Sequence, residues 1–190
     1  MNGYYVSLLI FLSGFFSSFA LASNTEISLG FGMSDYKFQH YSSELDTQDV
    51  GMALNLTHYP YVNELSTGVL SLGARVGINH PGNFHGSITA DDANDLGTSL
   101  MSPGPGVSLS AVSKYQYNDI FFRAGIGALY WSNSIYIDEV KVRDKNTSIL
   151  YSLEAGYQVA PDVDLSIGAT SSSYKGNMTN IYLFIITFHL

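Results

Sequence analysis

The chain has 190 residues, with 14 Tyr, 11 Phe and 18 Gly, no cysteine, and 13 % charged residues. Its formal net charge of −8 argues against a nucleic-acid partner, which would require a basic face. The lack of cysteine excludes a disulfide framework and a lipid-modified cysteine. A composition rich in aromatic residues and glycine favours strands over helices.

The first 22 residues are predicted to be a secretory signal peptide. They carry no charged side chain, include an apolar stretch from Val6 to Phe19, and end in the small-residue sequence Ala20-Leu21-Ala22. The alternative is an uncleaved membrane helix, for which the apolar stretch is barely long enough. Residues 23–190 then have the length of one domain or one closed barrel.

From Thr25 onward, apolar residues recur at every second position, which is the period of a strand. In each run one face is apolar, and the other consists mainly of Gly, Ser and Ala with single charged residues. The eight runs are Ile27–Met33, Val50–Thr57, Leu70–Ile78, Gly106–Tyr117, Ile120–Ser132, Ser148–Val159, Val163–Thr170 and Ile181–Leu190. They predict an all-β fold, an eight-stranded antiparallel up-and-down transmembrane β-barrel.

The connections between these runs alternate in length. Short turns are expected at residues 60–66, 118–119 and 160–162, a tight connection at 174–177, and long polar loops at 39–48, 79–105 and 133–147. Long loops on one rim and short turns on the other are typical of an outer-membrane barrel, with about 9 to 11 residues in each tilted strand. Ile135 to Val142 also alternates, as though that hairpin continues beyond the bilayer.

Four charged side chains decide which face of the strands meets lipid. They are Arg75, Lys114, Arg123 and Glu154. On the outside of a membrane barrel, each Arg or Lys near the midplane would cost about 2 to 4 kcal/mol. We therefore expect these four inside, as an interior ion-pair cluster. The alternative is a secreted soluble barrel or sandwich, with the apolar face inward.

Within the interior, Glu154 is expected to pair with Arg123, with Lys114 close by. Arg75 lies further from the short turns, where Asp35 or Asp49 could meet it. Eight strands leave an interior that side chains fill, so no open pore is expected. The ion pairs then form a structural plug, and a switchable gate for small ions is the alternative.

The last ten residues alternate up to the chain end. Tyr182, Phe184, Ile186, Phe188 and Leu190 are expected to face lipid while the strand pairs back to Ile27–Met33. On the inward side this strand carries three large residues instead of small polar ones: Ile181, Leu183 and Ile185.

Together with the segments Arg123–Trp131 and Leu153–Tyr157, this ending resembles the small bacterial outer-membrane β-barrel proteins, similar to the transmembrane domain of outer membrane protein A. The resemblance implies a place in the cell outer membrane of a Gram-negative bacterium, contact with outer-membrane lipids, and insertion by the barrel assembly machinery. That machinery reads a C-terminal signal that usually ends in Phe. Here the chain ends Phe188-His189-Leu190, so the aromatic residue lies two positions early.

With the interior closed, function is expected to reside in the loops. An adhesion or colonisation role through a host or surface ligand is the leading hypothesis, as in colonisation factors and adhesins that resemble this group. A structural barrel supporting envelope integrity is the alternative. A lipid-modifying enzyme would need a Ser, a His and an acid together; His85-Gly86-Ser87 with Asp91 and Asp92 is the nearest set, and it does not predict an enzyme. Nor do His80 and His85 predict a metal site, and no cofactor is expected.

Overall fold

The computed structural model describes residues 24–37, 48–82, 87–88, 102–137 and 140–190. Nine strands lie in these ranges: β1 (Thr25–Lys37), β2 (Gln48–Leu65), β3 (Gly68–His80), β4 (Ser87–Ile88), β5 (Gly106–Tyr117), β6 (Ile120–Ile137), β7 (Val140–Ala160), β8 (Val163–Tyr174) and β9 (Asn177–His189). The described residues contain no helix of the length and hydropathy that a membrane span requires.

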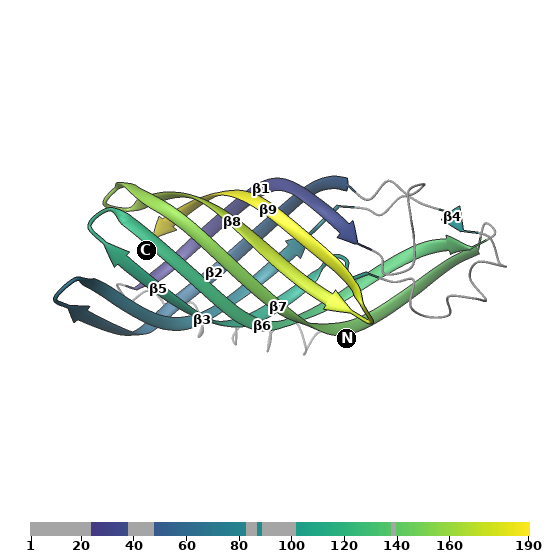
Figure 1. The fold of residues 1–190 in the computed structure, drawn as a ribbon, viewed down its shortest axis with the longest axis horizontal. Helices are drawn as coiled ribbons and strands as arrows, with labels where there is room; N and C mark the ends of the chain where they lie inside the picture. The colour runs from purple at the N-terminus through teal and green to yellow at the C-terminus, as the bar shows by residue number, and fades with distance from the viewer. Residues whose placement is uncertain (1–23, 38–47, 83–86, 89–101, 138–139) are drawn as a thin grey trace, which may run out of the picture.

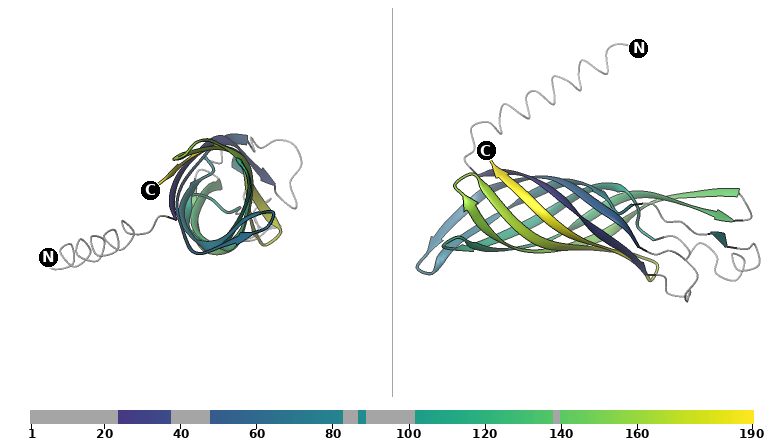
Figure 2. Two further views of the ribbon diagram at one scale, coloured as in Figure 1. Left: turned by 90° about the vertical axis from the view of Figure 1, so that its left-hand side faces the viewer. Right: turned by 90° about the horizontal axis from the view of Figure 1, so that it is seen from above.

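The eight long strands form a closed ring. Consecutive long strands pair antiparallel, and β9 pairs back onto β1, with Ile27 opposite Phe188 and Met33 opposite Tyr182. Figure 1 shows the strands tilted across the long axis, and the end view in Figure 2 shows the ring. The predicted eight-stranded up-and-down barrel and the predicted closing pair are therefore confirmed. The short β4 is an addition that pairs parallel with β6.

The outer face of the ring is apolar. Phe31 is 54 % exposed, and Leu153 and Ile167 are each 68 % exposed, while the alternate positions Ser28 and Thr187 are almost fully buried. On the closing strand the exposed residues are the predicted outward ones, Tyr182, Phe184, Phe188 and Leu190, with Ile186 half-buried. A band of large exposed apolar side chains around the whole molecule suits lipid and would be a liability in water.

The large inward residues of β9 form the middle of the core. The buried apolar cluster consists of Ala53, Ile181, Leu183 and Ile185. Two glycines on the neighbouring strands make room for it. A Cβ added at Gly51 would lie 2.4 Å from Cγ2 of Ile181, and one at Gly30 would lie 3.1 Å from Cδ1 of Leu183. The large side chains of β9 thus occupy the space that glycines leave on β1 and β2, and the packing remains close.

The short-turn end differs in part from the expectation. The turn at Asn118-Asp119 is present, with Asn118 in the left-handed region at φ 52°. The turn predicted over residues 60–66 is wrong, because β2 continues to Leu65 and the connection is Ser66-Thr67. Around Pro60 the pairing register shifts, as expected where a residue without an N–H interrupts a ladder.

The strands are also longer than the predicted 9 to 11 residues. The eight long strands range from 12 residues in β5 and β8 to 21 in β7. The longest strands, β2, β6 and β7, have 18, 18 and 21 residues because their hairpins continue beyond the ring, which a length estimate based on the bilayer alone does not include.

Candidate functional site

The predicted interior charges meet on three neighbouring strands. In the register of β5, β6 and β7, Lys114 lies opposite Arg123, which in turn lies opposite Glu154. Because side chains at one level of adjacent strands point to the same side, all three reach the barrel interior. Arg123 Nη1 donates to Glu154 Oε1 over 2.7 Å, and both side chains are buried. The expected Arg123–Glu154 pair is therefore present.

Two further carboxylates complete this network, and sequence analysis did not single them out. Glu26 on β1 accepts from Arg123 Nη2 and, over 2.8 Å, from Lys114 Nζ. Asp164 on β8 accepts from Lys114 Nζ over 3.1 Å. Lys114 thus pairs across the barrel, with acids 88 and 50 residues away in the chain.

Arg75 does not take the expected partners. Its Nη2 lies 3.5 Å from Glu154 Oε2, and its Nε donates to Thr57 Oγ1 over 3.0 Å. Asp35 instead lies 3.6 Å from Lys37 Nζ. The side chain of Arg75 reaches toward the short turns, so the prediction of Asp35 or Asp49 as its partner was wrong.

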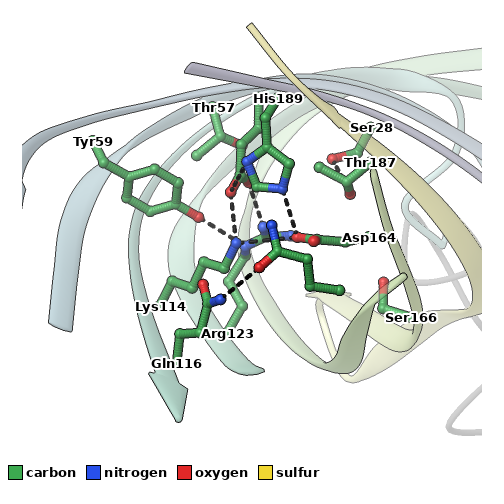
Figure 3. Close-up of polar contacts among 12 residues, drawn as sticks. Ser28, Thr57, Tyr59, Lys114, Gln116, Arg123, Asp164, Ser166, Thr187 and His189 are labelled. Carbon is green, nitrogen blue, oxygen red and sulfur yellow. Dashed lines mark hydrogen bonds and ion pairs between the residues drawn. The ribbon is translucent and has the colours of Figure 1, made fainter. Parts of the chain in front are cut away.

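The cluster fills the barrel interior toward the short-turn end and seals it. Its described members are three cations (Arg75, Lys114, Arg123) and three carboxylates (Glu26, Glu154, Asp164), so the formal charges balance. Figure 3 shows Lys114 and Arg123 at its centre, with the hydroxyl of Tyr59 directed at Arg123; Arg123 Nε donates to that hydroxyl over 2.8 Å. Phe121 is fully buried, with its ring centroid 4.6 Å from Lys114 Nζ. Buried charges are tolerated here because each has a partner.

A second seal lies at the long-loop end. Pro81 and Pro103, from the two ends of the connection between β3 and β5, are almost fully buried. Tyr36 Oη donates to the carbonyl of Gly82 over 3.3 Å, and Thr179 Oγ1 donates to the carbonyl of Pro103 over 2.5 Å. The cavity beneath these residues measures about 10 Å³, which is close to the minimum for one water molecule. Buried side chains therefore occupy the barrel interior at both levels.

Beyond the second seal, the β6–β7 hairpin projects from the ring (Figure 1). The last pair of β6 with β5 is Trp131 with Gly106, while the β6–β7 pairing continues from Ser132–Lys145 to Ile137–Val140. Six further pairs correspond to about 20 Å of strand. The expectation that this hairpin extends past the barrel is confirmed.

The base of the hairpin is firmly attached. Trp131 Nε1 donates to Ser148 Oγ over 2.7 Å, and Asn146 Nδ2 donates to Tyr174 Oη over 2.7 Å. The rings of Trp131 and Tyr174 meet edge to face with centroids 5.2 Å apart. A projection anchored in this way keeps a defined direction relative to the membrane.

Positive charge outside the interior is confined to the long-loop end. The chain has eight Lys and Arg in all, and three of them lie in the interior cluster. The other five lie at the long-loop ends of strands or in the turn between β8 and β9: Lys37, Lys141, Arg143, Lys145 and Lys175. Lys141, Arg143 and Lys145 occupy alternate positions of β7 within the projecting hairpin, and the last two are exposed.

The residues weighed for catalysis lie mostly outside the described residues. This applies to His85, Asp91 and Asp92, and of Ser87 the structure gives only the backbone, in β4. His80 is described, and its Nδ1 accepts from the backbone N–H of Gly82 over 3.1 Å. This hydrogen bond holds the backbone next to Pro81, which is part of the seal at this end of the barrel.

Solved structures with the same architecture identify the fold. The crystal structure of Ail, the attachment invasion locus protein of Yersinia pestis, matches with a TM-score of 0.60 and 13 % identity over 90 % of this chain and 100 % of that one. The outer membrane enzyme PagL matches with a TM-score of 0.53 and 14 % identity over 87 % of this chain and 99 % of that one. The fold is that of a small outer-membrane β-barrel.

A further structure, Ail in complex with the heparin analogue sucrose octasulfate, matches with a TM-score of 0.57 and 13 % identity over 90 % of this chain and 100 % of that one. No family model matches the sequence, and the search of curated proteins found no match. Together with the apolar outer face, the fold supports the predicted location in the outer membrane and the predicted resemblance to this group of barrels.

Proposed function

We propose that this barrel is a surface-attachment protein whose projecting β6–β7 hairpin contacts anionic polysaccharide outside the cell. The observation that carries the proposal is the hairpin itself, which extends about 20 Å past the ring. A sealed interior makes transport a poor alternative, so the exposed end is where a ligand can bind. The named role of Ail in attachment and invasion agrees with this assignment.

The basic residues of the hairpin favour an anionic ligand. The chain is acidic overall, yet three alternate positions along one strand of the hairpin are basic residues: Lys141, Arg143 and Lys145. Same-face positions on a strand repeat every 6.7 Å or so, a spacing that suits sulfate or carboxylate groups along a sugar chain. The heparin analogue bound by Ail is a polysulfated sugar, which supports the same chemistry here.

The test is attachment of cells that display the barrel. Residues 134–143 are replaced by an Asn-Gly turn between the paired residues Asn133 and Asp144, since two residues of this kind close a hairpin. We expect attachment to a heparin-coated surface to fall to the level of cells without the protein. Equal attachment with and without the hairpin, at equal surface amounts, would refute the proposal.

A charge-matched pair of variants separates the hairpin from general electrostatics. Arg143→Gln with Lys145→Gln removes two positive charges from the hairpin, and Lys37→Gln with Lys175→Gln removes two from elsewhere at the same end. Only the first pair is expected to weaken attachment and its dependence on salt. If both pairs weaken attachment equally, net charge and not the hairpin is responsible. If neither does, a structural role in the envelope is the better assignment.

We also infer that the barrel is not an enzyme, although PagL shares its fold. The support comes from the sequence, in which His85, Ser87, Asp91 and Asp92 form no spaced motif. Comparing outer-membrane lipids by mass spectrometry, with and without the protein, tests this inference. A lipid product that disappears in Ser87→Ala would contradict it.

A further inference from the structure

Three side chains that commonly bind metals meet at the short-turn rim, away from the hairpin. They are Glu26 near the start of β1, Asp164 near the start of β8, and His189 at the end of β9. Because β8, β9 and β1 are adjacent in the ring, their inward side chains converge. One ligand atom from each lies within 4.8 Å of the others.

Two atoms of this group lack a hydrogen-bond partner. Asp164 is 1 % exposed, and its Oδ1 accepts no hydrogen bond. His189 Nε2 is equally buried and unsatisfied, although it lies 3.0 Å from Asp164 Oδ2, because the geometry is not that of a hydrogen bond. Buried polar atoms without partners are uncommon in folded proteins and indicate a bound ligand or another role.

We propose that Glu26, Asp164 and His189 bind a divalent transition-metal ion such as Zn²⁺. One imidazole nitrogen with two carboxylate oxygens is a ligand set that such ions accept, and Zn²⁺ coordinates each type at about 2.0 to 2.2 Å. Three atoms within 4.8 Å of one another can close around one ion with small side-chain movements. The side chain of His189 is 25 % exposed, which provides access from the rim, while both acids are buried.

Lys114 is the built-in competitor for this site. Its Nζ lies 2.8 Å from Glu26 Oε1 and 3.1 Å from Asp164 Oδ2, so the ammonium neutralises two of the three ligands. Figure 3 shows Lys114 together with Asp164 and His189 of this group. A metal ion of charge +2 beside it would be repelled, so Lys114 must leave these oxygens when the ion binds. The long stem of lysine allows this movement, whereas Arg123 is also fixed to Glu154 and Tyr59.

The experiment measures Zn²⁺ binding by calorimetry to the full mature barrel, refolded in detergent without a histidine tag. Removing even an outer-sphere partner costs about 10- to 100-fold in affinity, so His189→Asn is expected to weaken binding at least about tenfold. Lys114→Met removes the competing ammonium and is expected to tighten binding about tenfold or more. His58→Asn and His80→Asn are matched controls outside the cluster and should leave affinity unchanged.

Each outcome bears on the proposal. Weaker binding in His189→Asn with tighter binding in Lys114→Met supports it. Binding that persists in both His189→Asn and Asp164→Asn places the ion elsewhere and overturns it. Binding by Lys114→Met alone overturns it for the natural protein, in which the ammonium would then be the permanent occupant. Heat-dependent gel mobility of every variant shows whether the barrel has folded, so loss of binding is not confused with loss of structure.

Discussion

Removing Glu154 should destabilise the barrel more than the loss of any one surface charge. The Glu154→Ala variant deletes the acceptor of Arg123 Nη1 at 2.7 Å and of Ser166 Oγ at 2.8 Å, and the carboxylate beside Arg75 at 3.5 Å. Two arginines would remain buried with one negative charge fewer. Breaking a buried pair by removing one partner costs about 3 to 5 kcal/mol, and we expect a loss of unfolding free energy in this range.

The assay is equilibrium unfolding in guanidinium with lipid vesicles, followed by the fluorescence of Trp131. This is the single tryptophan, and it is buried against Tyr174 at the opposite end of the barrel, so its signal reports global unfolding. Glu64→Ala, at an exposed position of the short-turn end, is the control and should change stability by less than about 0.5 kcal/mol. If Glu154→Ala costs no more than Glu64→Ala, the interior network is not holding the barrel together.

The other predictions concern the seals and the core. Tyr59→Phe removes the hydroxyl that accepts from Arg123 Nε and should cost about 1.5 to 3 kcal/mol in the same unfolding assay. Gly51→Val should lower the yield of folded, heat-modifiable barrel because its side chain would meet Ile181, and Ile181→Ala in the same chain should restore part of that yield. In planar bilayers the natural protein and Glu154→Ala are both expected to show no steady conductance, because the seal of Pro81 and Pro103 remains; steady current through Glu154→Ala alone would favour a gate.

The strand pattern was predictable because each strand has two unlike faces. Alternation in Ile181–Leu190 fixed which side chains point outward, and the closing pair with Ile27–Met33 followed from the even number of strands. Pro60 does not follow this pattern. A proline favours a turn, yet it can also lie at a bulge inside a longer strand, and local sequence does not distinguish the two.

The interior contacts were less predictable because strands in a barrel are tilted and staggered. Pairs between adjacent strands, such as Arg123 with Glu154, can be placed from hairpin register alone. Contacts across the barrel depend on the shear of the whole ring, which determines which residues share a level. Glu26 and Asp164 were missed for this reason, since their partner Lys114 is on a distant strand. The sequence also does not show that the Arg75 side chain extends toward the short turns and meets Glu154.

The two proposed sites lie at opposite ends of the barrel, and this separation gives a last prediction. Between the hairpin and the group containing His189 stand the buried apolar cluster and the seal of Pro81 and Pro103. Coupling requires an element with two arrangements that the two sites favour differently, and a core of interlocking apolar side chains offers little room for one. Zn²⁺ affinity should therefore be the same, within about twofold, in the hairpin-truncated barrel and in the natural one. A larger difference, reproduced in lipid vesicles, would show that the ring transmits ligand binding from one rim to the other and that its interior is less rigid than its packing indicates.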